Sequence, residues 1–353
     1  MDVIINLLLF IVILGIIVFV HEFGHFIFAK KAGIYVYEFS IGFGPKLFSF
    51  KRKNDETEYM IKLIPLGGYV AMAGETYEDE QGEEKKEIVP EEKRLYNKSF
   101  LRQLSVMVAG VFNNFVLGII LLFIIGLVYG STFTSNVLDN MEKDYPLYVA
   151  GARNGDRVIE INNKKVRNFD DIQTRIAIAG EKSTLKIKVK SKKNGINTYK
   201  IKPKYDKKTK SYYYGISIKT ENKTGFLSAI KYAFVKFVSI YKSLIVIIIS
   251  LFTGKLGVDS LSGPVGIYGV VGVAKSSLYS LIYLTAYLSI NVGFMNLLPF
   301  PAFDGGRAFL LVIEKIIKKK VPLKVETIIN EIGFILLMAL MVFVTIKDVL
   351  KLF

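Results

Sequence analysis

The two histidines of this chain lie four residues apart, in the segment His21-Glu22-Phe23-Gly24-His25. Side chains four residues apart on a helix share a face, so both imidazoles can bind one metal ion. Glu22 lies beside them and could take a proton from metal-bound water. The alternative is a pair of buried histidines that hydrogen-bond to the backbone. We favour a metal site, because ionisable groups in an apolar helix are costly unless paired or ligated.

A catalytic zinc site needs a third protein ligand and a position left open for water. The chain has no cysteine, which excludes disulfides, iron–sulfur clusters and thiolate ligands, so this ligand must be a carboxylate. Asp304 directly follows an apolar stretch, at a depth similar to that of His21. Alone, it would be interpreted as a turn aspartate before two glycines, but with the histidines it is predicted to be a ligand. Such a set binds zinc and can also bind iron.

The elements that must carry these residues are membrane helices. The chain has 353 residues, 51% of them hydrophobic, with 22% charged and a mean hydropathy of +0.37, which indicates apolar spans plus a separate polar part. Four spans are predicted by length, at residues 3–29, 104–129, 278–298 and 332–346. The stretch 226–252 carries three lysines and is interpreted as interfacial, with a fifth span as the alternative.

A polar domain is predicted between the second and third spans. Residues 139–223 hold 21 lysines and arginines against 10 acidic residues. Alternating runs such as 185–189 predict strands, and 169–179 predicts a short helix. No nucleic-acid recognition motif is present, so the charge is interpreted as attraction to anionic lipid or acidic peptides. The basic loop 303–326 is placed in the cytoplasm and the inserted domain outside.

With these motifs the chain resembles the bacterial site-2 proteases, intramembrane zinc metalloproteases of the regulator-of-sigma-E protease type, over nearly its whole length. The similarity rests on residues 21–25 and on the segment Asn-Leu-Leu-Pro-Phe-Pro-Ala-Phe-Asp-Gly-Gly at 296–306. Three further stretches, 39–45, 64–75 and 262–267, also match. Two departures are Phe303, where the family has leucine, and Val111, where its second-span motif has proline.

The resemblance implies a Zn²⁺ ion held by His21, His25 and Asp304, with Glu22 as the base. It also implies a re-entrant β-hairpin at about 35–75 that dips into the membrane and pairs with an unwound substrate strand. Asparagines of the spans would hold the substrate backbone, with helix–helix hydrogen bonding or packing as the rival interpretation. The implied substrate-binding residues are Asn291, Asn296, Asn114, Gly42, Gly44, Gly67 and Gly68.

The expected fold is therefore a polytopic α-helical membrane protein with about four transmembrane helices, a membrane-associated β-hairpin and one inserted extracytoplasmic α/β domain. Residues 150–162 of the insert resemble a single PDZ domain, which would bind carboxy termini or act as a size filter. The expected divisions are 1–130 and 278–353 for the two membrane halves, 131–222 for the PDZ-like domain and 223–277 for an interfacial segment.

The expected function is an intramembrane zinc endopeptidase of the bacterial inner membrane, with its active site toward the cytoplasm. Its partners would be membrane lipid and single-pass membrane proteins already shortened by another protease, such as anti-sigma factors or remnant signal peptides. No nucleic acid is expected as a partner. The rival from another class is a non-proteolytic membrane scaffold that holds peptides on its PDZ domain. Intact Glu22 argues against the scaffold, because a scaffold needs no base beside a metal.

Overall fold

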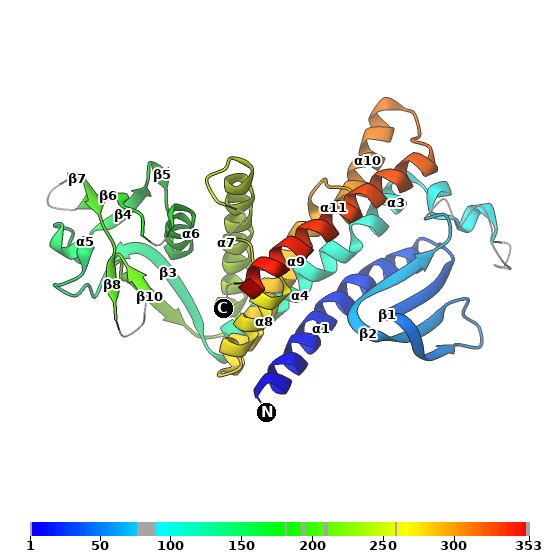
Figure 1. Cartoon of the computed structure of the whole chain (residues 1–353), viewed down its shortest axis with the longest axis horizontal. Coiled ribbons are helices and arrows are strands. Elements are labelled where there is room, and N and C mark those ends of the chain that lie inside the picture. Colours follow the sequence, from blue (N-terminus) through cyan, green and yellow to red (C-terminus); the bar gives the residue numbers. More distant parts are fainter. Residues whose placement is uncertain are drawn as a thin grey trace. The chain divides into compact units, whose positions relative to one another are not determined.

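The computed structural model describes residues 2–75, 89–180, 182–191, 195–207, 211–257 and 260–350. The chain forms two compact units (Figure 1). One comprises Met1–Leu121 and Ser262–Phe353, and the other Leu122–Leu261. The first unit contains both histidines and Asp304, so it carries every residue predicted to hold the metal.

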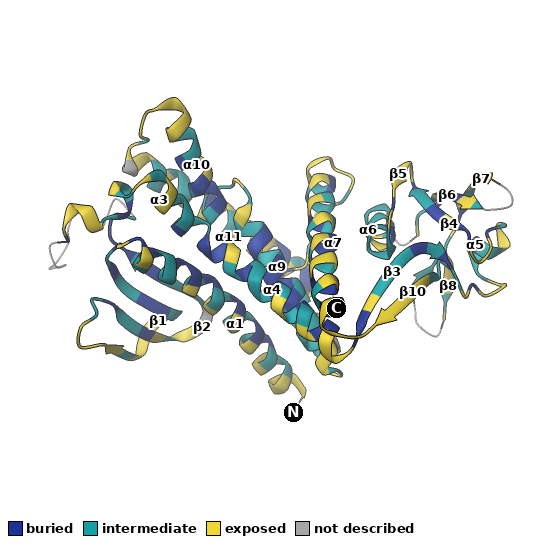
Figure 2. Ribbon diagram, turned by 180° about the vertical axis from the view of Figure 1, so that it is seen from behind, coloured by how far each residue is buried: buried dark blue, intermediate teal, exposed yellow. Residues whose placement is uncertain are grey.

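Five helices of the described chain are long and apolar enough to cross a membrane. They are α1 (Asp2–Lys31), α4 (Ala109–Val128), α7 (Phe226–Phe252), α9 (Leu278–Leu297) and α11 (Leu323–Leu350). Helix α11 exposes apolar side chains along much of its length, and exposed residues also recur along α7 (Figure 2). Water-soluble helices confine such side chains to one buried face, whereas helices in lipid do not. The protein is therefore embedded in a membrane.

The sequence predicted four spans, and α7 makes the fifth helix of this kind. It runs unbroken for 27 residues, and one of its three lysines pairs with the inserted domain. Lys236 forms an ion pair of 2.7 Å with Asp170 of α6 (Phe169–Ala179). Thr174 of α6 donates a hydrogen bond to Ser243 of α7. The interfacial placement of α7 stays a prediction.

The second predicted span is divided in two. Helix α3 (Phe100–Met107) ends at its C-cap Val108, and α4 begins at Ala109. The remaining helices of this unit are α8 (Pro264–Ala274) and α10 (Asp304–Ile317), with two short 3-10 turns at Glu91–Lys93 and Leu95–Asn97. Helix α9 ends before Pro299 and Pro301, and the turn that follows places Asp304 at the first position of α10.

The predicted hairpin is a wider sheet than the sequence suggested. Strands β1 (Val36–Lys51) and β2 (Glu58–Met72) both bend, so that residues 38–41 pair with 68–71 and also with 58–61, while 48–51 pair with 58–61 on the other side. The bends coincide with Gly42, Gly44 and Gly67, whose φ angles are positive and therefore suit glycine. Among the described residues, the segment Gly68–Met72 is paired on one side only and forms an edge of this sheet.

The loop of this sheet is tied to the end of α1. Lys30 donates a hydrogen bond of 2.6 Å to Asp55, which also accepts from the Thr57 amide and the Tyr59 hydroxyl. Burial by itself raises the pKa of Asp55, but these three donors together hold that pKa well below its ordinary value. The ionised carboxylate therefore stabilises the loop.

Replacing Asp55 by asparagine is expected to lower the free energy of unfolding by about 2 kcal/mol at pH 7, because a charged hydrogen-bond acceptor is lost. A carboxylate whose pKa is lower in the folded state than in the unfolded state stabilises the fold at pH values above its unfolded pKa. This stabilisation is lost progressively as the pH falls from the unfolded pKa toward the folded pKa. The difference between wild type and variant should shrink below about pH 4, in thermal unfolding followed in detergent. Glu58→Gln removes an exposed ion pair with Lys46 and serves as the control, with little change expected. An Asp55 effect as small as this control would contradict the assignment.

The second unit contains a six-stranded sheet of order β10-β3-β4-β6-β7, in which β5 pairs with β4. Leu147, Ile161, Ile172 and Leu185 are fully buried in its core. Helix α6 has the bounds predicted from the sequence, and its N-cap Asn168 accepts a hydrogen bond from the Asp171 amide. The other elements are β3 (Ser131–Leu138), α5 (Pro146–Val149), β4 (Arg157–Ile161), β5 (Lys164–Lys165), β6 (Leu185–Ser191), β7 (Gly195–Ile201), β8 (Lys204–Asp206), β9 (Ser211–Tyr213) and β10 (Ile218–Lys223).

Candidate metal centre

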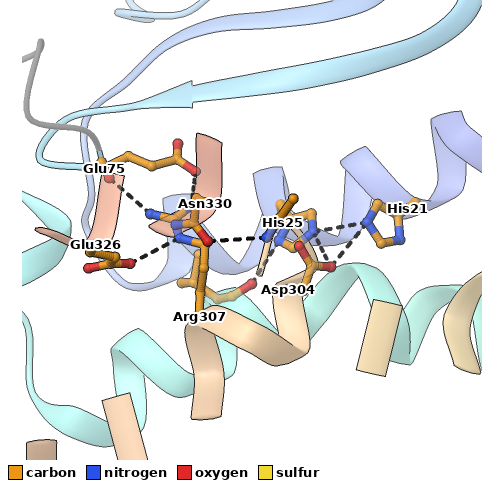
Figure 3. Close-up of polar contacts among 9 residues, drawn as sticks. His21, His25, Glu75, Asp304, Arg307, Glu326 and Asn330 are labelled. Atoms are coloured by element: carbon orange, nitrogen blue, oxygen red, sulfur yellow. Dashed lines mark hydrogen bonds and ion pairs between the residues drawn. The ribbon is translucent and has the colours of Figure 1, made fainter. Parts of the chain in front are cut away.

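Three predicted ligands meet in the first unit (Figure 3). The Nε2 atoms of His21 and His25 are 3.3 Å apart. Asp304 Oδ2 lies 3.1 Å from Nε2 of His21 and 3.2 Å from Nε2 of His25. Both histidines are buried, and Asp304 is half-buried. Two distant parts of the chain, α1 and the start of α10, are thus brought together at three potential ligand atoms.

This geometry fits zinc. Nitrogen and oxygen ligands lie about 2.0–2.1 Å from zinc, so at tetrahedral angles they are about 3.3 Å from one another, close to the three separations observed here. Two imidazoles and one carboxylate leave the fourth tetrahedral position for water or substrate. Among the residues that the structure describes, this is the one group of three histidine or acidic side chains arranged to hold a metal ion.

The helix junction at Val108 positions the histidines. His25 Nδ1 lies 2.8 Å from the carbonyl oxygen of Val106, at the end of α3, which leaves Nε2 to face Asp304. Gly110 lies directly against both rings: a Cβ atom there would be 2.4 Å from His25 Nε2 and 2.7 Å from His21 Nε2. Neither contact has a signature in the sequence, because both arise between helices.

Glu22 lines the same cavity as the three ligands. This cavity has a volume of about 150 Å³. Its wall also includes Tyr69, Val70 and Met72 from the free edge of β2. A Cβ atom at Gly68 would be 3.1 Å from Glu22 Cγ, so this edge passes directly beside the glutamate. The lining residues are His21, Glu22, His25, Tyr69, Val70, Met72, Glu75, Leu95, Val106, Met107, Asp304 and Arg307.

A half-buried ionic network holds the helix that carries Asp304. Arg307, one turn along α10, donates to the carboxylate and the backbone carbonyl of Glu75 and pairs with Glu326 of α11 at 3.4 Å (Figure 3). The turn before α10 is fixed by Ala302, whose amide donates to Asn330. Three segments that are distant in sequence therefore determine where Asp304 lies, and none of these contacts was evident from the sequence.

Replacing Arg307 by alanine is expected to lower the free energy of unfolding by about 1–3 kcal/mol, because two half-buried carboxylates lose their partner. The unfolding midpoint in detergent would measure the loss. Lys315→Ala, at an exposed position of the same helix, should change the midpoint little. Equal midpoints for the two variants would show that the network does not stabilise α10.

The other predicted residues are distributed as follows. Gly68 lies at the cavity edge, whereas Gly42, Gly44 and Gly67 shape the bends of β1 and β2. Asn291 and Asn296 are half-buried on α9, and no described residue hydrogen-bonds to either side-chain amide. Asn114 is fully buried, with its amide nitrogen 3.2 Å from His21 Nδ1.

A helical membrane protein with a His₂-carboxylate site and an adjacent glutamate has the features of a membrane zinc metallopeptidase. The sequence profile described as Peptidase family M50 matches residues 9–340. A candidate zinc metalloprotease of Clostridium perfringens is 37% identical over 319 residues, or 90% of each chain. One from Clostridium acetobutylicum is 36% identical over 316 residues, or 89% of this chain and 88% of the relative. The zinc metalloprotease RasP of Bacillus licheniformis is 32% identical over 388 aligned residues, or 90% of this chain and 92% of the relative.

The chain belongs to peptidase family M50, the site-2 proteases. It is a zinc metallopeptidase embedded in a membrane. The resemblance inferred from the sequence motifs is thereby confirmed. The PDZ-like character of the inserted domain stays a prediction.

Proposed function

We propose that this protein is an intramembrane endopeptidase in which His21, His25 and Asp304 hold zinc and Glu22 is the general base. The convergence of the three ligand atoms within 3.1–3.3 Å carries this proposal. A zinc ion held by these residues would supply a Lewis acid and activate water for attack. Glu22 would accept the proton released in that attack and pass it to the leaving amine of the peptide bond.

The size of the cavity favours an unwound substrate. A helix with its side chains is about 10–12 Å wide, too wide for a cavity of about 150 Å³. An extended strand could instead pair with the free edge Gly68–Met72, whose residues line this cavity. Strand addition uses backbone hydrogen bonds and so accepts many side chains. Glu22 would then lie beside the scissile bond.

The far half of the β1–β2 sheet has a surface suited to lipid. Its exposed side chains are predominantly large and apolar, in contrast to the buried first half of β1. An exposed apolar patch of this kind marks a membrane or protein contact, so we place this half in the membrane, where substrate helices lie. The exposed large apolar residues are Phe43, Leu47, Phe48, Phe50, Ile61, Leu63 and Ile64.

The substrates we propose are single-pass membrane proteins already shortened by another protease, including anti-sigma factors and remnant signal peptides. The inserted domain would lie outside the bacterial inner membrane and exclude intact proteins or bind their new carboxy termini. The active site would then open toward the cytoplasm, on the side of the basic loop 303–326.

The test uses purified protein in lipid vesicles with a single-pass reporter in two forms, one with a folded extracytoplasmic domain and one lacking it. The shortened reporter should be cut within its transmembrane segment, and removal of zinc with a chelator should stop the cleavage. Mass spectrometry of the fragments locates the cut. Cleavage only outside the membrane segment would overturn the intramembrane assignment. Equal cleavage of both reporters would overturn the proposed size selection.

A further inference from the structure

Asn114 of α4 lies behind His21, on the side of the imidazole away from Asp304. Its side-chain amide nitrogen is 3.2 Å from His21 Nδ1, while Nε2 of the same ring faces Asp304. Asn114 is 0% exposed, and its side-chain oxygen is buried without a hydrogen-bond partner among the described residues. An orphaned buried oxygen is costly, so this contact needs a physical explanation.

The metal site determines which atom of the amide should face the ring. An imidazole that binds zinc through Nε2 carries its proton on Nδ1 and needs an acceptor there. His25 has such an acceptor in the carbonyl oxygen of Val106. At His21 the facing group is the Asn114 amide, which can present either oxygen or nitrogen after a half-turn. With nitrogen presented, two donors would face each other at 3.2 Å.

We propose that Asn114 is a positioning residue whose side-chain oxygen accepts the Nδ1 proton of His21 and so directs Nε2 to the metal. This inference rests on the proposed ligand set. It assigns Asn114 a role in zinc binding, whereas the sequence resemblance suggested contact with substrate. Its burial behind His21, outside the set of residues that line the metal cavity, favours the new assignment.

The surroundings of Asn114 keep it in place. Its backbone carbonyl accepts a hydrogen bond of 2.8 Å from the fully buried Ser289 of α9. Gly293, one turn further along α9, lets the two helices approach, because a Cβ atom there would be 3.2 Å from Asn114 Cβ. Helix α9 therefore holds Asn114 in place behind His21. Because α9 also leads into the turn before Asp304, it links the position of Asp304 to that of His21.

The first test measures zinc affinity by competition with a chromogenic chelator. Asn114→Leu keeps the size but removes the acceptor, and should weaken zinc binding by about 10- to 100-fold. Asn114→Asp restores an acceptor and should bind within a few-fold of wild type. Asn113→Leu is the matched control: the neighbouring amide donates to the carbonyl of Val20 instead, so its loss should leave zinc affinity almost unchanged.

Unchanged zinc affinity in Asn114→Leu would overturn the proposal and leave Asn114 with a packing role. Loss of zinc in both Asn114→Leu and Asn114→Asp would overturn it in another way, by showing that the amide donates instead of accepting. His21→Gln tests the ligand set independently of the role of Asn114. If this variant keeps its zinc, the ligand set itself is wrong.

A second measurement needs no variant and so does not depend on folding of the mutants. The chain has two histidines, so ¹⁵N-histidine labelling of the zinc-loaded protein in vesicles gives four ring nitrogens in a solid-state NMR spectrum. Both imidazoles should carry the proton on Nδ1, with His21 Nδ1 hydrogen-bonded. A proton on Nε2 of His21 would overturn the proposal.

Discussion

Replacing Glu22 by glutamine is expected to slow peptide cleavage by about 100- to 10,000-fold, the usual contribution of a general base. Glutamine has nearly the same shape but cannot take a proton from water. The zinc ligands are unchanged, so the variant should retain about one zinc per chain. Initial rates on a shortened membrane reporter, together with zinc content, would measure both effects.

Glu22→Asp provides the comparison, because it keeps the carboxylate but withdraws it by one methylene group. Its rate should fall between those of wild type and Glu22→Gln. A glutamine variant that cleaves at the wild-type rate would remove Glu22 from the mechanism. A variant that loses its zinc would show instead that Glu22 supports the metal site.

The second large effect is expected for Gly110→Ala. The added methyl group would lie 2.4–2.7 Å from ring atoms of His21 and His25, closer than non-bonded atoms approach. One or both imidazoles, or the start of α4, must therefore move. The variant should lose most of its zinc, and cleavage should fall with it, as measured by metal analysis and reporter assay.

A methyl group at Gly110 does not oppose helix formation, since alanine is favoured over glycine in helices by about 1 kcal/mol. Gly15→Ala is the matched control in α1: nothing lies within 4 Å of a Cβ atom there, and zinc should be retained. Full zinc occupancy in Gly110→Ala would contradict the close approach of the α3–α4 junction to the histidines.

The sequence was sufficient to predict features that depend on residues close together in the chain. His21 and His25 come together because helical spacing puts them on one face, and α6 was predicted with its observed bounds because its N-cap Asn168 and the following Gly180 limit it. Asp304 could be predicted as a ligand only together with the two histidines. The chain has no cysteine and no further histidine, and the residue count along the spans places Asp304 at a depth similar to that of His21. In these cases composition and periodicity determine the outcome.

The sequence was insufficient to predict contacts between segments that are distant in the chain. Gly110 is one of 29 glycines, and only the approach of α4 to α1 shows that its missing side chain accommodates both imidazoles. The lysines of α7 suggested an interfacial helix, but nothing in the sequence indicated that Lys236 pairs with Asp170. The four-segment pairing of β1 and β2 depends on bends that the alternating pattern does not encode. Each of these features is a tertiary contact without a local signature.

The zinc K-edge X-ray absorption spectrum of the purified wild-type protein is the sharpest test of the proposed His₂-carboxylate zinc site. It should show about one zinc per chain, bound by two imidazoles and by oxygen ligands at about 2.0–2.1 Å. Because the two histidines are the only ones in the chain, two imidazole signals identify His21 and His25. If the protein cleaves its reporter with one imidazole on zinc, or with none, His21 and His25 are not both ligands and the proposed site is wrong.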